Sequence, residues 1–206
     1  MILADDEQRW AYLSIPKCAC TSIRTALESH WSMEPSPLIH NRDWLGHWHD
    51  VDWCIPEGTY SWTVIRCPLD RLLSTWADKC RGHQQDPDWP KTVDPVYRPV
   101  LGKPLTEFVE YIWDFDVDNP AMDAHLRSQS TFIGKRHLDF PIPFEHLSVR
   151  WAHLQRLYGF PPLPHYNKSI HSSVDESYTR VTRLAVKALY TDDLRLYRHS
   201  LESCHA

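Results

Sequence analysis

The 206-residue chain has the composition of an ordinary soluble globular protein, with 42% hydrophobic and 24% charged residues. Its length predicts one domain over residues 1–206, large enough for a sizeable core. The net charge of −5 argues against a nucleic-acid binder with a broad basic face, although a local cluster of cations can still bind a small anion. The sequence contains no apolar run of transmembrane length, and its N-terminus does not resemble a signal peptide. We therefore expect a cytoplasmic protein whose six cysteines are free thiols.

A strand, a turn and the start of a helix follow one another near the N-terminus. The sequence predicts a short buried strand over residues 10–15 and a helix over residues 21–29, capped near Thr21 or Ser22. The segment between them, "PKCACTS", has the layout in which the first amides of a helix bind an anion.

This segment lacks the glycines of a nucleotide-triphosphate loop, whose pattern is G-x-x-x-x-G-K-[ST]. The small residues Cys18, Ala19 and Cys20 can still let a ligand approach the backbone closely. Lys17 adds a mobile positive charge, and the hydroxyls that follow add hydrogen-bond donors. Taken alone, these residues leave two interpretations open: an anion site, or a capped helix beside a solvated lysine.

The second segment of interest is "VIRCPLDRLLSTW". A strand over residues 60–65 ends at Arg66, and Pro68 begins an amphipathic helix that carries Ser74 two turns beyond Arg66. An arginine at the carboxyl end of a strand lies where parallel α/β sheets bind their ligands, and its guanidinium suits a phosphate. Arg71, on the helix face away from the apolar stripe, can equally be a structural ion-pair partner.

The rest of the chain alternates helices with short apolar runs. Most of residues 31–60 and the proline-rich residues 82–104 are predicted to be loops. Helices are predicted over residues 105–113, with Thr106 as a cap, over 147–158, stopped by Gly159, and over 175–198, with a break near Thr191; "TFIG" and "FPIPFE" are candidate strands. Strands that alternate with helices predict an α/β layer fold with a parallel sheet.

Taken together, "PKCACTS" and "RCPLDRLLS" resemble the two signature segments of sulfotransferases that use 3′-phosphoadenosine-5′-phosphosulfate (PAPS), above all the carbohydrate branch with its heparan 2-O- and chondroitin-type enzymes. The resemblance extends, with lower specificity, through "HLRSQSTFIG", "FPIPFEHL", "HYNKS" and "LYTDDLRLY". It implies a P-loop-like three-layer fold with a central parallel sheet flanked by helices. It also implies that Lys17 and residues 18–22 bind the 5′-phosphosulfate, that Arg66 and Ser74 bind the 3′-phosphate, and that Lys168 contributes to the donor site.

A histidine pair in "GHWHD" precedes Arg66, with His49 at a distance of 17 residues. In the resembled family, a histidine in this interval, often the second of such a pair, is the general base. We therefore expect His49 to accept the proton of the acceptor hydroxyl, and His47 to orient it or to contact the substrate. His125, in "DAHLRSQ", is the rival candidate for the base.

No metal is expected to take part in the reaction. "DFDVDN" resembles the start of a calcium loop but fails at the sixth and twelfth positions, and Cys18-x-Cys20 lacks zinc-finger spacing. The sequence thus favours a metal-free, PAPS-dependent transfer of a sulfuryl group to a hydroxyl, with a carbohydrate as the favoured acceptor. A small-molecule kinase of related layout and a non-catalytic nucleotide- or glycan-binding relative stay open as alternatives.

Overall fold

The computed structural model describes residues 2–32, 48–49, 54–81, 88, 91, 93–164 and 177–203. The chain forms two compact units: unit 1 comprises residues 1–66, 132–168 and 197–206, and unit 2 comprises residues 67–131 and 169–196. His47 and Lys168 lie outside the described residues, as does the side chain of His49.

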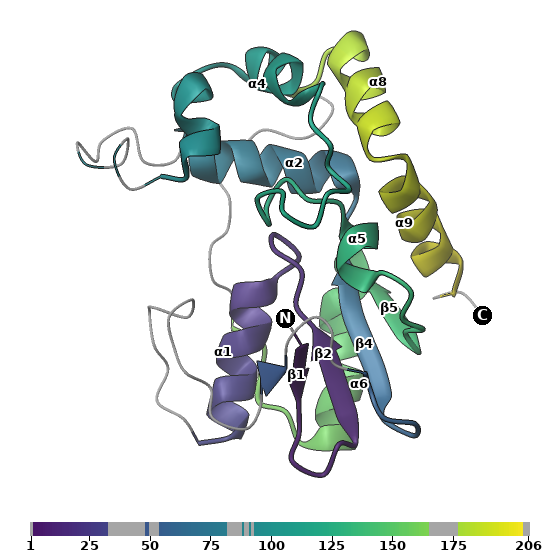
Figure 1. The fold of residues 1–206 in the computed structure, drawn as a ribbon. Helices are drawn as coiled ribbons and strands as arrows, with labels where there is room; N and C mark the ends of the chain where they lie inside the picture. Colours follow the sequence, from purple (N-terminus) through teal and green to yellow (C-terminus); the bar gives the residue numbers. More distant parts are fainter. Residues whose placement is uncertain are drawn as a thin grey trace. The chain divides into compact units, whose positions relative to one another are not determined.

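Unit 1 is built on a five-stranded sheet with the strand order β3-β1-β2-β4-β5 (Figure 1). The strands are β1 (Ile2–Ala4), β2 (Trp10–Leu13), β3 (Trp48–His49), β4 (Tyr60–Ile65) and β5 (Phe140–Pro143). β4 pairs in parallel with both β2 and β5, whereas β1 pairs antiparallel with β2 and with β3. The predicted α/β class with a parallel central sheet is confirmed, and β1 and β3 add an antiparallel edge. The short connection between β1 and β2 explains why these two strands are antiparallel, because a crossover between parallel strands needs a much longer connection.

Large aromatic side chains fill the interior of unit 1. Tyr12 of β2 pairs in register with Trp62 of β4, and their ring centroids are 4.5 Å apart. Helices α1 (Cys20–His30) and α6 (Leu147–Tyr158) belong to this unit, and Trp151 of α6 packs against Trp62 at 6.1 Å. Gly159 ends α6 in a left-handed conformation, with φ of 70°, as the sequence predicts.

Unit 2 is mainly helical. Its described elements include α2 (Pro68–Trp76), the π-helical turn η1 (Ala77–Arg81), the 3-10 helix η2 (Pro95–Val100), α4 (Leu105–Ile112) and α8 (Arg180–Leu189). Further helices among the described residues are α5 (Gln129–Ile133), η3 (Phe144–His146) and α9 (Thr191–Ser203). In Figure 1, α2, α4 and α8 lie together, and their apolar faces form a shared core that includes Leu73, Phe108 and Val186. The break near Thr191 is confirmed, since α8 ends at Leu189 and α9 begins at Thr191.

Four local predictions are wrong. Within the segment 82–104, predicted to be a loop, residues Pro95–Val100 form the 3-10 helix η2, which Asp94 caps by accepting from the amide of Val96. α1 begins at Cys20 with Ala19 as its N-cap, and not at Thr21 or Ser22. α4 begins directly after Pro104, whose extended backbone makes it the N-cap in place of Thr106. "TFIG" is not a strand, because its first residues belong to α5. The α5 amides of residues 129 and 130 donate to the buried carboxylate of Asp193 at 2.8 Å, a tertiary cap that local propensity cannot reveal.

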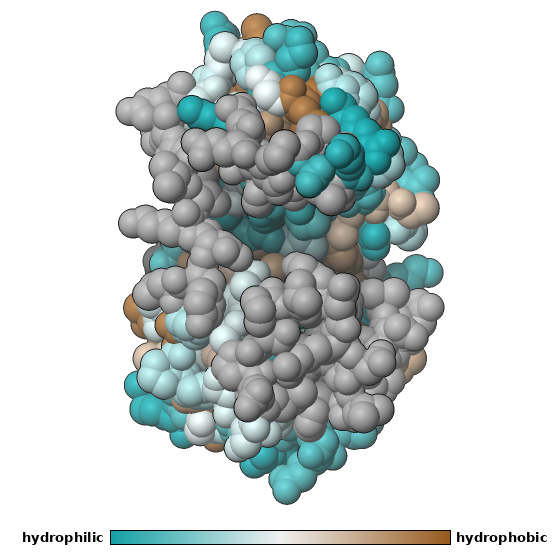
Figure 2. Space-filling view, turned by 90° about the vertical axis from the view of Figure 1, so that its left-hand side faces the viewer, coloured by the Kyte–Doolittle hydropathy of each residue, from teal (hydrophilic) through white to brown (hydrophobic). Residues whose placement is uncertain are grey.

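The surface is mostly polar on the face that Figure 2 shows, where teal predominates among the described residues and brown patches are small. The large apolar side chains that are exposed are Val149 and Leu157 on α6, Val181 and Leu184 on α8, and Trp113. A few exposed apolar residues are normal for a folded protein. Within the described residues, no helix has both the length and the apolar character to cross a membrane.

Candidate anion-binding site

A tight loop over residues 14–19 connects the end of β2 to the start of α1. The amide of Cys18 donates to the carbonyl of Ile15 at 3.3 Å, and Cys18 and Ile15 are both fully buried. Lys17 and Ala19 on either side of Cys18 adopt left-handed backbone conformations, with φ of 66° and 59°. Such conformations are uncommon for residues other than glycine, and they occur where successive amides form a concave anion site. Cys18 is therefore the buried residue of the loop, whereas Lys17 and Ala19 on either side of it are partly exposed.

The N-terminus of α1 has the electrostatic character that an anion requires. The first intrahelical bond runs from the amide of Ile23 to the carbonyl of Ala19 at 3.0 Å, so the amides of residues 20–22 have no acceptor within the helix. Ala19 has no side-chain oxygen, so the N-cap residue itself supplies no side-chain hydrogen bond to this end of the helix. The first turn also contains no acidic residue. The positive end of the helix dipole therefore favours an anionic ligand.

The structure brings Arg66 to this loop. Arg66 follows β4, and its Nη1 donates to the carbonyl of Lys17 at 3.0 Å. Its guanidinium also stacks over the Phe144 ring, with 4.6 Å between Cζ and the ring centroid. These two contacts fix the Arg66 guanidinium beside the backbone of Lys17, in the loop that precedes α1.

Sequence reasoning missed a third cation in this region, Arg24. It lies on α1, is only 3% exposed, and occupies an electrostatic cluster with Tyr12, Cys20 and Glu28. Burial lowers the pKa of Arg24, and electrostatic interactions with Cys20, Tyr12 and Glu28 oppose that decrease. Burial likewise raises the pKa of Tyr12 well above its usual range. The i, i+4 spacing of Arg24 and Glu28 is a signal in the sequence, but it reads equally well as an exposed ion pair.

Ser74 belongs to α2 in unit 2, where it is 2% exposed. On the same helix, the buried Arg71 is a structural residue: its Nη1 and Nη2 donate to the carbonyls of residues 127 and 124 at 2.8 and 3.1 Å. These contacts support a structural role for Arg71. Its acceptors are backbone carbonyls, however, and not the carboxylate of an ion pair.

His125 lies in the segment that Arg71 holds. Its Nδ1 is 3.3 Å from Oδ1 of Asp123, and its side chain is 24% exposed. The rival base of the sequence analysis therefore has a carboxylate partner. The two other histidines that were considered, His47 and His49, cannot be compared with it, because their side chains lie outside the described residues.

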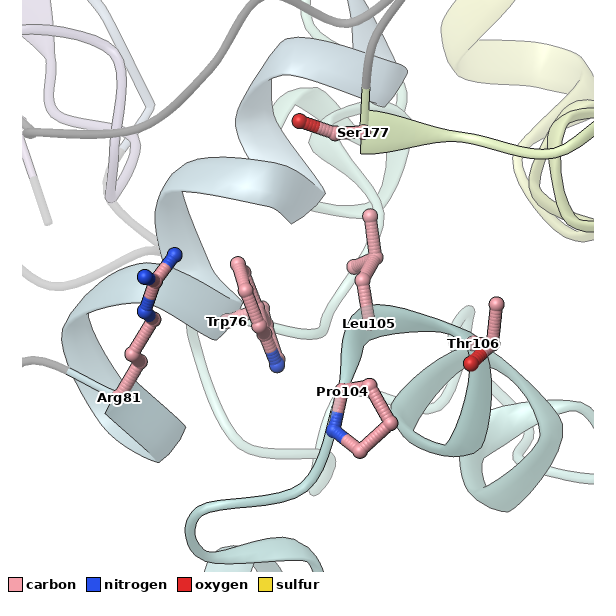
Figure 3. Close-up of a pocket in the computed structure, with 6 residues that line it drawn as sticks. All are labelled: Trp76, Arg81, Pro104, Leu105, Thr106 and Ser177. Carbon is pink, nitrogen blue, oxygen red and sulfur yellow. The ribbon is translucent and has the colours of Figure 1, made fainter.

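Unit 2 also contains a small pocket of about 230 Å³, drawn in Figure 3. The lining residues are Trp76, Arg81, Pro104, Leu105, Thr106 and Ser177. The guanidinium of Arg81 lies over the Trp76 ring at 5.6 Å, and the indole Nε1 donates to the Lys103 carbonyl at 2.9 Å. The pocket thus combines an aromatic and aliphatic wall with one cation and two hydroxyls.

The described residues contain no group of three His, Cys, Asp or Glu side chains that could hold a metal ion. The five cysteines among them, at positions 18, 20, 54, 67 and 80, are free thiols, as expected.

The comparisons with known proteins add a family assignment to this geometry. The model of the sulfotransferase family matches residues 1–200, which is nearly the whole chain. No curated protein and no solved structure gave a match. The mixed α/β sheet flanked by helices agrees with the P-loop-like fold of that family. On the strength of a match over residues 1–200, the chain belongs to the sulfotransferase family.

Proposed function

We propose that this protein transfers the sulfuryl group of PAPS to an acceptor hydroxyl. The observation that carries the proposal is the N-terminus of α1, which follows the left-handed Lys17 and Ala19 and lies beside Arg66, bonded to the Lys17 carbonyl. A doubly charged phosphosulfate suits this loop, because the first amides of α1, the residue Lys17 and the Arg66 guanidinium bonded to the loop all supply positive charge.

The residues of this chain would divide the work as follows. The amides of residues 19–22 and Lys17 would hold the 5′-phosphosulfate and neutralise the charge that develops on the leaving nucleotide. Arg66, together with Ser74, would bind the 3′-phosphate and so distinguish PAPS from ATP. A histidine would accept the acceptor's proton, with His49 and His125 as the candidates. As the family resemblance implies, Lys168 would contribute to the donor site, and His47 would orient the acceptor hydroxyl or contact the substrate.

The acceptor is proposed to be a carbohydrate. The pocket of Figure 3 supports this assignment, because the Trp76 edge and Leu105 offer apolar contact to a sugar ring while Arg81 and the hydroxyls of Thr106 and Ser177 offer polar contact. A glycan that already carries carboxylate or sulfate groups would suit the single cation of this pocket best.

Calorimetric titration with adenosine 3′,5′-bisphosphate, ADP and ATP tests the proposal, each without and with magnesium. We expect metal-independent binding of the 3′,5′-bisphosphate and no binding of ADP at the same concentration. A preference for ATP with magnesium would overturn the proposal in favour of a kinase. If none of the nucleotides binds, the protein is a relative that has lost the donor site.

A further inference from the structure

The carboxyl ends of two neighbouring parallel strands lie side by side in unit 1. In the pairing of β4 with β5, Ile65 lies opposite Pro143. Arg66 directly follows Ile65, and Phe144 directly follows Pro143. The register of the sheet therefore brings an arginine and an aromatic ring together, although these two residues are far apart in the sequence.

Two contacts restrain the Arg66 guanidinium in complementary ways. Its Nη1 donates to the Lys17 carbonyl at 3.0 Å, which holds one end of the group. Its Cζ lies over the Phe144 ring, 4.6 Å from the ring centroid, which limits how the guanidinium plane can turn. Arg66 and Phe144 are both partly exposed, so a ligand in solvent can reach the stacked pair.

The Phe144 ring is itself held in place. Phe144 begins the turn η3, which joins β5 directly to α6. On the same turn, Oε1 of Glu145 accepts a hydrogen bond from the Tyr197 hydroxyl on α9 at 2.9 Å. All three residues belong to unit 1, as do Arg66 and Lys17. The strand, the helix and the hydrogen bond thus restrain the turn that carries the ring.

We infer that Phe144 is a positioning residue that orients the Arg66 guanidinium for the donor's 3′-phosphate and so sets the preference for 3′-phosphorylated nucleotides; the inference rests on the proposed function. A guanidinium is attracted to the negative face of an aromatic ring, and an aliphatic side chain offers no such face. A freely rotating arginine loses conformational freedom when it binds a phosphate, whereas an arginine already held against a ring loses less. The ring therefore strengthens the phosphate contact by acting through Arg66.

The first experiment replaces the ring and compares two nucleotides by calorimetry. Phe144→Leu keeps an apolar side chain but loses the aromatic face. We expect the Kd of adenosine 3′,5′-bisphosphate to rise roughly 3- to 10-fold, as the loss of one cation–π contact would produce. The Kd of adenosine 5′-monophosphate, which has no 3′-phosphate, should change less than about twofold. Phe144→Tyr keeps the aromatic face and should restore the preference of the wild type.

Phe140→Leu is the matched control. Phe140 lies at the opposite end of β5, and Arg150 stacks on its ring at 5.0 Å, so this variant loses an equivalent contact of unit 1. Its affinity for both nucleotides should equal that of the wild type.

The calorimetry separates failure of the inference from failure of the proposed function. The inference is overturned if the wild type and Phe144→Leu bind the bisphosphate equally, or if Phe144→Leu loses the same affinity for both nucleotides. It is also overturned if Phe140→Leu weakens bisphosphate binding as much as Phe144→Leu does. These results leave the proposed function intact, whereas a wild-type protein that does not bind the bisphosphate overturns both.

Two further measurements show whether the ring acts through Arg66. In a double-mutant cycle, Phe144→Leu should have no additional effect on bisphosphate affinity when Arg66→Ala is already present. Additive losses would mean that the ring contacts the nucleotide itself, and they overturn the inference. In proton NMR of the nucleotide-free protein, the side-chain resonances of Arg66, assigned by their loss in Arg66→Ala, should lie upfield because of the ring current of Phe144. A wild-type spectrum without this shift also overturns the inference.

Discussion

Replacement of Arg66 is the sharpest test of the proposed anion site. In Arg66→Ala the protein loses the Nη1 bond to the Lys17 carbonyl at 3.0 Å and the stacking on Phe144 at 4.6 Å. The donor would also lose its charge-assisted hydrogen bonds with the guanidinium, each worth about 1.5–3 kcal/mol. One such bond corresponds to roughly a 10- to 150-fold increase in Kd. We therefore expect adenosine 3′,5′-bisphosphate to bind about 10- to 150-fold more weakly, and Arg66→Lys to fall in between, because lysine keeps the charge but not the fork.

The matched control is Arg150→Ala. Arg150 lies on α6 and stacks on Phe140 at 5.0 Å, so its removal also deletes a cation–π contact of unit 1. Such contacts are worth about 0.5–1 kcal/mol at partly exposed sites. Both alanine variants should therefore lose similar thermal stability, while Arg66→Ala alone loses affinity in the calorimeter. If Arg150→Ala weakens binding as much as Arg66→Ala, or if Arg66→Ala binds like the wild type, the assignment of Arg66 to the anion site is refuted.

Three further predictions concern single positions. Ala19→Asp should weaken binding of the bisphosphate at least tenfold, because the new carboxylate would compete for the amides of α1. The neutral Ala19→Asn should have a smaller effect, since asparagine tolerates the left-handed backbone and adds no charge. Equal affinities of the two variants in calorimetry would contradict this prediction. Asp193→Ala should lower the free energy of unfolding by about 2–4 kcal/mol in denaturant titration, because the amides of residues 129 and 130 lose a buried charged acceptor; a change below 1 kcal/mol would show that these amides find other partners. Burial raises the pKa of Asp139, but hydrogen bonds from the Ser61 hydroxyl and amide outweigh this effect, so the pKa of Asp139 is lowered in the folded protein. The ionised carboxylate therefore stabilises the fold at pH values above the pKa of Asp139 in the unfolded chain. This stabilisation is lost as the pH falls through the lowered pKa of the folded protein. Asp139→Asn should therefore flatten the dependence of the melting temperature on pH in the acidic range, and a slope equal to that of the wild type would argue against this role.

The elements that sequence reasoning located are those whose pattern is local. β2, β4 and α2 carry dense apolar runs or a regular amphipathic stripe, and Pro68 and Gly159 mark helix ends through their own backbone preferences. The anion loop was recognised for the same reason, since a strand, small residues and a helix start follow one another within about a dozen positions. The short β1 was missed, because three apolar residues at a chain end give too little periodicity to identify a strand.

Helix caps and the α5 segment depended on contacts that are distant in sequence. Asp193 caps α5 across more than sixty residues, so "TFIG" became helical although its β-branched and aromatic residues favour a strand. Likewise, Ala19 adopts a left-handed conformation and is the N-cap of α1. The helix therefore begins at Cys20, before Thr21 and Ser22, the residues expected to cap it.

The sequence by itself determined that this protein would be an α/β member of the sulfotransferase family, because the two signature segments combine residue chemistry with local spacing. Only the tertiary structure decided which charges meet. Arg66 reaches the Lys17 carbonyl from a strand that is nearly fifty residues away, Arg24 is buried on α1, and His125 gains a carboxylate that Tyr97 holds in place. The physical reason is that hydrogen bonds and electrostatic fields act through space over a few ångströms, whereas the sequence records only the order of residues along the chain.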